Sequence, residues 1–214
     1  MSSVVYVHGM WMPAIEMAWL RKKLAKDHQL HGELFGYPSV RGTLDENAEL
    51  LADFVRHIAG SSRVHLVGHS LGGVLALRML ALNPDSPVNR VVCIGSPLCG
   101  SSAARMLSQH EWGRAILGKS VVGGIAGSPA SEWAGDVVAR HEVGTIAGTI
   151  SAGLGRLVTT FDGPNDGTVA VAQTELPNAK DRVNVAASHS TLVLSKEVAS
   201  QVAAFLGCGE FLKD

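Results

Sequence analysis

Two apolar segments of this chain are joined by a corner that contains three glycines and one serine. The first segment, Val64–Val67, is short and rich in β-branched residues, which predicts a buried strand. The second segment, Val74–Leu82, is rich in leucine, alanine and methionine, which predicts a helix. Between them stands the pattern Gly68-x-Ser70-x-Gly72. A strand that turns into a helix over so few residues predicts an α/β fold.

Ser70 occupies the centre of this corner, where we expect a strained backbone. Gly68 and Gly72 carry no side chains, so they leave room for such a conformation. The turn would lift the Ser70 hydroxyl clear of the sheet, and the first N–H groups of the following helix would face a developing negative charge. This arrangement is a nucleophile elbow. The alternative is a glycine-rich turn that carries an inert serine.

The residues Gly-His-Ser-Leu-Gly-Gly at 68–73 resemble the elbow of the small lipase and esterase branch of the α/β-hydrolase family. The resemblance extends from Val4 to about Leu206, which is nearly the whole chain. It implies a mostly parallel central sheet with helices on both faces. It also implies a serine that cleaves carboxylic esters through an acyl-enzyme. We therefore expect a single α/β-hydrolase domain over residues 1–214.

The rest of the chain alternates predicted strands with predicted helices, as a parallel sheet with right-handed crossovers requires. Besides the strand at the corner, strands are predicted at residues 4–7, 30–37, 88–94, 143–150 and 183–187. Besides the helix at the corner, helices are predicted at residues 14–26, 43–58 and 191–206. Thr43 or Asp45 could cap the second of these helices.

Cleavage of an ester by a serine needs a base that takes the hydroxyl proton and an acid that orients the base. In α/β-hydrolases these groups follow along the chain as serine, acid and histidine. Ser70, Asp166 and His189 satisfy this order, and no other histidine follows Asp166. In the lipase-like branch an Asn-Asp-Gly turn carries the acid, and Asn165–Gly167 matches it. Asp162, on the same loop, is the alternative acid, and either aspartate could instead be a simple turn residue.

The segment from His8 to Met12 follows the first predicted strand directly. In the resembled family a His-Gly pair at this point shapes one side of the oxyanion hole. The resemblance therefore implies that the backbone N–H groups of Met10 and Leu71 bind the oxyanion, each contributing at most about 3–4 kcal/mol. We expect the His8 side chain itself to hydrogen-bond within its own loop.

Apolar side chains close to Ser70 predict a pocket for a small-molecule ester with a neutral, apolar acyl chain. Its walls are expected to include Trp11, Met12 and Leu98. None of these side chains can clamp a phosphoryl or carboxylate group. The remaining histidines are interpreted as surface or structural groups, including His69, whose side chain should leave the elbow away from Ser70.

Residues 102–140 interrupt the alternation, at the position where the resembled family inserts a cap. Helical patches at 103–109 and 111–117 lead into a stretch of glycines and small apolar residues. This segment could form a mobile lid, with Trp112 and Trp133 as anchors or as acyl-contacting surface. It could equally pack as ordinary helix and loop over the edge of the sheet.

Composition argues against several classes of function. The 18 Lys and Arg residues nearly balance the 19 Asp and Glu residues, and no basic stripe predicts nucleic-acid binding. The corner lacks the lysine of a P-loop and the spacing of a dinucleotide fingerprint, so we expect no cofactor. No cluster of histidine and aspartate has zinc-ligand spacing, so we expect no metal.

The sequence also predicts where the protein acts. The first residues are predicted to form a strand rather than a signal peptide, and no apolar run is long enough to span a bilayer. The three cysteines have no metal-ligand spacing and are typical of thiols in a reducing compartment. We therefore expect a cytoplasmic protein without a transmembrane segment.

Two other functions remain open from the sequence. An acyltransferase on the same fold would pass the acyl group to an acceptor other than water. A non-catalytic member of the fold would act as a binding module. Such members typically lose the serine or the histidine, and this chain retains both.

Overall fold

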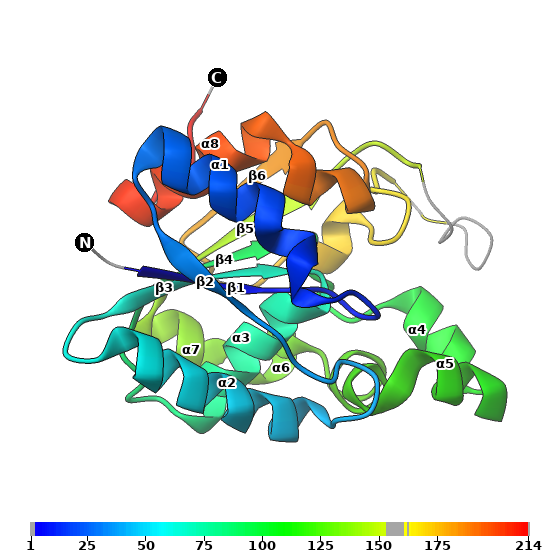
Figure 1. The fold of residues 1–214 in the computed structure, drawn as a ribbon. Coiled ribbons are helices and arrows are strands. Elements are labelled where there is room, and N and C mark those ends of the chain that lie inside the picture. The colour runs from blue at the N-terminus through cyan, green and yellow to red at the C-terminus, as the bar shows by residue number, and fades with distance from the viewer. Residues whose placement is uncertain (1–2, 153–160, 162, 214) are drawn as a thin grey trace.

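The computed structural model describes residues 3–152, 161 and 163–213, and these form a six-stranded sheet flanked by helices (Figure 1). The strand order is β2-β1-β3-β4-β5-β6, and every neighbouring pair is parallel. The strands are β1 (Ser3–Val7), β2 (Gly32–Phe35), β3 (Val64–His69), β4 (Val88–Ile94), β5 (Glu142–Gly148) and β6 (Asp181–Val185). The predicted parallel sheet is confirmed, with small shifts of the strand ends.

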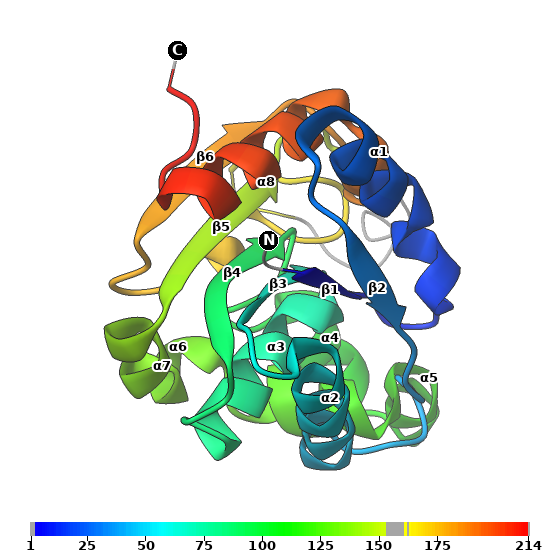
Figure 2. The same cartoon turned by 60° about the vertical axis from the view of Figure 1, so that its left-hand side comes forward.

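Helices cover both faces of this sheet (Figures 1 and 2). One face carries α1 (Ala18–His28) and α8 (Lys196–Cys208), and the other carries α2 (Leu44–Ala59), α3 (Leu71–Leu82), α6 (Ala130–Trp133) and α7 (Gly135–Arg140). The other helical segments are η1 (Ala14–Met17), α4 (Ser102–Ser108), α5 (Glu111–Val121), the π-helix η2 (Val122–Gly127), η4 (Val171–Thr174) and η5 (His189–Leu194). Across the described ranges, none of the helices combines the length and apolar character needed to cross a bilayer.

The two faces of the sheet form two separate apolar cores. In β1, Val5 and Val7 belong to the core beneath α2 and α3, whereas Val4 and Tyr6 belong to the core beneath α1 and α8. Successive side chains of a strand point to opposite faces, so a strand buried on both sides must be apolar at every position. The sheet is therefore fixed between two helical layers.

A capping box fixes the start of α2. The Thr43 hydroxyl oxygen accepts a hydrogen bond from the Glu46 N–H at 3.2 Å, and the Glu46 carboxylate accepts one from the Thr43 N–H at 2.8 Å. Each bond satisfies an N–H group that the first turn would otherwise leave without a partner. Of the two predicted caps, Thr43 is the one the structure uses.

The last predicted helix, residues 191–206, is divided in the structure. The 3-10 helix η5 comes first, and α8 begins only after Ser195, whose hydroxyl oxygen accepts a hydrogen bond from the Val198 N–H at 3.3 Å. A serine side chain that bonds to nearby backbone can end one helix and start another. The prediction of a continuous helix was wrong because apolar periodicity runs through this break without marking it.

Residues 102–140, expected either as a lid or as ordinary covering structure, form α4, α5, η2, α6 and α7. Trp133 donates its indole N–H to the Ser128 carbonyl at 3.1 Å, and the Arg78 guanidinium lies 5.4 Å from the Trp133 ring centroid. Trp133 therefore anchors this segment against α3. The side chain of Trp112 lies outside the described residues, and mobility of the segment stays a prediction.

His65 is a buried histidine in β3. It is 4% exposed, and its Nδ1 has no hydrogen-bond partner among the described residues. Burial, assisted by the positive charge of Arg90, lowers the pKa of His65 from its ordinary value to about 4. The folded protein therefore keeps this imidazole neutral at pH values where the unfolded chain protonates it.

We expect this difference to make the fold less stable as the pH falls from about 6.5 toward 4. In that window the unfolded chain binds a proton that folded His65 does not, so the contribution to the free energy of unfolding falls by about 2 kcal/mol between pH 7 and pH 5. Urea unfolding at both pH values measures the change. The variant His65→Gln should lose about 2 kcal/mol less than the wild type over this interval. Equal losses in the two proteins would contradict this explanation.

Candidate active site

Ser70 lies between β3 and α3. Its φ and ψ angles are 53° and −121°, a conformation that residues with side chains rarely adopt. Backbone hydrogen bonds hold it there, since its N–H donates to the Ile94 carbonyl at 2.8 Å and its carbonyl accepts from the Gly73 N–H at 3.1 Å. The tight corner that the sequence predicts is present, and Ser70 remains partly exposed.

Two glycines make this corner possible. A Cβ atom at Gly68 would lie 2.5 Å from the backbone of Gly72, and a Cβ atom at Gly72 would lie 2.2 Å from the Val7 carbonyl oxygen. Both distances are far below van der Waals contact, so no larger residue fits without moving the backbone. The lack of a side chain at Gly72 also lets the end of β1 approach the start of α3 closely. The loop that follows β1 therefore borders Ser70.

His189 and Asp166 approach Ser70 from two other loops. His189 Nε2 lies 3.1 Å from Ser70 Oγ, and His189 Nδ1 lies 2.7 Å from Asp166 Oδ2. His189 begins η5 after β6, and Asp166 lies between β5 and η4. The C-terminal ends of parallel strands meet at one edge of a sheet, which brings together residues that are distant in sequence. The structure thus places the three sequence-predicted residues in one hydrogen-bonded chain.

Asp166 is held firmly at the buried end of this chain. It is 1% exposed, and its Oδ1 accepts hydrogen bonds from the N–H groups of Thr168 at 2.9 Å and Val169 at 2.7 Å. Its backbone carbonyl accepts a further bond from the His189 N–H at 2.9 Å. These donors compensate the burial of the carboxylate and leave Oδ2 for His189.

These contacts determine which nitrogen of His189 carries the proton. An ionised carboxylate can only accept, so Nδ1 donates to Asp166. Nε2 of the neutral ring is then unprotonated and can accept the proton of the Ser70 hydroxyl. Such an arrangement can activate a serine for attack on a carbonyl carbon. The alternative acid, Asp162, lies outside the described residues.

The predicted oxyanion donors lie on segments that border Ser70. Leu71 is the first residue of α3, so its N–H has no acceptor within the helix. Met10 follows Gly9, where a Cβ atom would lie 3.3 Å from the Ser70 Cβ. The binding of an oxyanion by these two N–H groups stays a prediction.

The His8 side chain bonds within its own loop, as expected, and also to the segment that follows β2. Its Nδ1 lies 2.8 Å from the Gly9 carbonyl oxygen, and its Nε2 accepts a hydrogen bond from the Tyr37 N–H at 3.3 Å. Burial is the main effect on His8 and lowers its pKa below the ordinary value. The neutral ring therefore stabilises the loop and is not available as a base.

The three predicted pocket residues differ in exposure. Trp11 is 57% exposed and Met12 is 45% exposed, so both are accessible to a substrate. The Trp11 indole N–H donates to the Ile116 carbonyl at 3.0 Å, which links the loop after β1 to α5. Leu98 is fully buried in the core beneath α2 and α3, and the structure gives no support to its side chain as a pocket wall.

The structure also reveals a group that the sequence analysis missed. Glu16 Oε1 lies 3.0 Å from His69 Nδ1, and Glu16 Oε2 accepts a hydrogen bond from the Gly9 N–H at 2.8 Å. His69 is 2% exposed, so it is a structural histidine and not a surface one. The sequence offers one signal that singles out this glutamate. Glu16 is the only acidic residue between Gly9 and Lys26.

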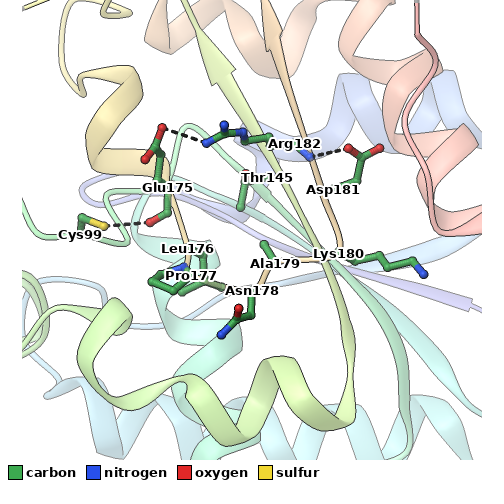
Figure 3. A pocket seen from close by; sticks show the side chains of 10 residues that line it. All are labelled: Cys99, Thr145, Glu175, Leu176, Pro177, Asn178, Ala179, Lys180, Asp181 and Arg182. Carbon is green, nitrogen blue, oxygen red and sulfur yellow. Dashed lines mark hydrogen bonds and ion pairs between the residues drawn. The ribbon is translucent and has the colours of Figure 1, made fainter.

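No group of three or more His, Cys, Asp or Glu side chains in the described part of the chain is arranged to hold a metal ion. A cavity of about 460 Å³ opens elsewhere, at the start of β6 (Figure 3). There Arg182 pairs with Glu175 at 3.0 Å. The residues that line this cavity include neither Ser70 nor His189.

A model of the alpha/beta hydrolase family matches residues 4–193. The chain belongs to the alpha/beta hydrolase family. Among solved structures, the mature lipase BlEst2 of Bacillus licheniformis superposes with a TM-score of 0.73 and 19% identity, over 97% of this chain and 91% of that one. An esterase of Thermogutta terrifontis superposes with a TM-score of 0.65 and 15% identity, over 98% of this chain and 90% of that one. None of the curated proteins matches this chain in sequence.

We expect Ser70 to be the serine that a fluorophosphonate probe labels, because His189 Nε2 is within hydrogen-bond distance of its hydroxyl. The variant His189→Gln should react at least about 100-fold more slowly. As a matched control, Ser190→Ala changes an exposed neighbour of His189 and should leave the rate unchanged. Peptide mapping by mass spectrometry identifies the labelled residue, and a label on any other serine would contradict the assignment.

Proposed function

We propose that this protein is a serine hydrolase that cleaves carboxylic esters through an acyl-enzyme on Ser70. The observation that carries the proposal is the continuous contact from Ser70 Oγ to His189 Nε2 at 3.1 Å and from His189 Nδ1 to Asp166 at 2.7 Å. The strained corner at Ser70 supports it further, because strain of this kind is concentrated at functional sites. The structural likeness to proteins described as a lipase and an esterase is consistent with the same reaction.

In the first half of the reaction, Ser70 Oγ attacks the ester carbonyl carbon while its proton moves to His189 Nε2. The carbonyl oxygen becomes an oxyanion, which the N–H groups of Met10 and Leu71 stabilise. Collapse of this intermediate breaks the bond to the alcohol oxygen, and His189 returns the proton to that leaving group. The alcohol departs, and the acyl group stays on Ser70.

In the second half, water attacks the acyl-enzyme and gives its proton to His189. A second oxyanion forms and collapses, the acid is released, and Ser70 recovers its proton. Asp166 remains ionised throughout, since it holds the Nδ1 proton in place and stabilises the imidazolium that forms in both halves.

The substrate class is inferred from two side chains of the loop after β1, which borders Ser70. Trp11 and Met12 are exposed on the loop after β1, and both are apolar. Each methylene buried against such surfaces adds up to about 0.8 kcal/mol, so a neutral acyl chain gains affinity with length until the surface ends. We therefore propose neutral esters of short to medium acyl length as substrates.

We expect Asp166→Asn to reduce kcat by about 10⁴-fold, because the amide no longer holds the His189 proton on Nδ1. Asp162→Asn, four residues earlier in the chain, should retain most of the activity. Asp136→Asn alters an exposed aspartate of α7 and serves as the control. Steady-state hydrolysis of a p-nitrophenyl ester measures all three. A larger loss in Asp162→Asn than in Asp166→Asn would transfer the acidic role to Asp162.

We also expect hydrolysis of p-nitrophenyl esters to be greatest between butyrate and octanoate, with no increase at a lipid interface. The panel runs from acetate to palmitate, with and without an emulsion. Activity confined to long-chain emulsions would contradict the proposed substrate class. No hydrolysis of any ester by protein whose Ser70 still takes the probe would favour an acyltransferase, which an added alcohol acceptor would then reveal.

A further inference from the structure

A second pair of a carboxylate and an imidazole is buried behind the nucleophile. The side chains of His69 and Glu16 are 3% and 8% exposed, and their nearest polar atoms lie 3.0 Å apart. His69 directly precedes Ser70, whereas Glu16 comes from η1, more than fifty residues earlier. The pair therefore joins the corner to η1, which follows residues 8–13, the oxyanion loop that carries the proposed donor Met10.

Glu16 and His69 each contact the backbone of another segment of the proposed site. Glu16 Oε2 accepts the Gly9 N–H at 2.8 Å, one residue before Met10. His69 Nε2 lies 3.2 Å from the backbone carbonyl oxygen of His189. One continuous set of contacts thus connects the oxyanion loop, the corner and the loop of the base.

The hydrogen-bond partners determine the protons on His69. The His189 carbonyl can only accept, so Nε2 of His69 carries a proton. Glu16, if ionised, can also only accept, so Nδ1 of His69 carries a proton too. The ring is then an imidazolium whose charge is balanced by Glu16.

The surroundings of Glu16 favour its ionised form. Burial by itself raises the pKa of the Glu16 carboxyl, but the hydrogen bond and charge of His69 and the N–H of Gly9 outweigh it, so the pKa lies below its ordinary value. A carboxylate with two hydrogen-bond donors, one of which is a cationic partner, is one that a buried site can hold.

We propose that Glu16 and His69 form a charged positioning pair, which sets the orientation of the Met10 N–H and of the His189 imidazole at once. This inference rests on the proposed function, because it assigns a role within the same reaction. Glu16 fixes the peptide unit that ends at the Gly9 N–H, and the next peptide unit carries the Met10 N–H. His69 fixes the peptide unit that begins at the His189 carbonyl, and so restricts the backbone from which the imidazole extends.

Two substitutions at Glu16 separate positioning from charge. Glu16→Ala removes both hydrogen bonds and should lower kcat about 100-fold, since small displacements of reacting groups are costly. Glu16→Gln can still accept the Gly9 N–H and can donate to a neutral His69, so kcat should fall less than about 10-fold. KM should change little in both variants, because the contacts act on the transition state rather than on substrate binding.

Two control variants replace groups away from the site, one a buried histidine and the other an ion-paired glutamate. His65→Ala removes a buried histidine from the same strand, and Glu142→Gln removes a carboxylate that pairs with Arg90. Both should keep wild-type kcat while the variants at Glu16 lose it. Urea unfolding of all four proteins establishes that each is folded under the assay conditions.

Nitrogen-15 NMR of histidine-labelled protein tests the charge directly. In the wild type at pH 7, both ring nitrogens of His69 should carry protons. In Glu16→Gln, Nδ1 of His69 should appear unprotonated. The wild-type spectrum requires neither a variant nor enzymatic activity, so it stands even if a substitution prevents folding.

The outcomes distinguish this inference from the proposed function. A neutral His69 in the wild type, or a folded Glu16→Ala with kcat within twofold of the wild type, would overturn the positioning pair alone. Equal losses of kcat in Glu16→Ala and Glu16→Gln would also contradict positioning through hydrogen bonds. If wild-type protein hydrolyses no ester and its Ser70 takes no probe, the proposed function fails instead.

Discussion

The strained backbone at Ser70 is the feature on which the rest of the site depends. A conformation of this kind costs roughly 1–3 kcal/mol and persists only where the surroundings enforce it. Gly68 and Gly72 permit it, because a side chain at either position would collide with backbone atoms. Gly95, on the loop after β4, has a φ of 56°, and a Cβ atom there would lie 3.3 Å from Asp166 Oδ2. The end of β1 is therefore packed against the start of α3, and the loop after β4 is packed against Asp166 and His189.

Two buried pairs of a carboxylate and an imidazole flank this corner, and they differ in environment. Asp166 receives two backbone N–H groups besides His189, whereas Glu16 receives one besides His69. The pairs meet where His69 contacts the His189 carbonyl, and the two rings lie 4.9 Å apart. Polar networks in a low-dielectric interior reinforce one another, so substitutions in one pair should affect the other non-additively.

Much of this arrangement could be predicted from the sequence, because its signals are local. The glycine pattern around Ser70 and the alternation of strands and helices anticipated the corner and the sheet. Chain order selected His189, and the Asn-Asp-Gly turn of the resembled family favoured Asp166 over Asp162, although their catalytic roles stay predictions. Glu16 was missed because one acidic residue in an amphipathic helix is usually solvated, and only tertiary packing reveals that it is buried. The burial of Leu98 depends on tertiary packing in the same way.

The central claim is that nucleophile, base and oxyanion donors converge on one reacting carbon. A crystal structure of the protein after reaction with an alkyl phosphonate ester tests it most directly, because the adduct imitates the tetrahedral intermediate. The account predicts phosphorus bonded to Ser70 Oγ, with the phosphoryl oxygen about 2.7–3.1 Å from the N–H nitrogens of both Met10 and Leu71. An adduct on another residue, or a phosphoryl oxygen that contacts neither N–H group, would contradict it.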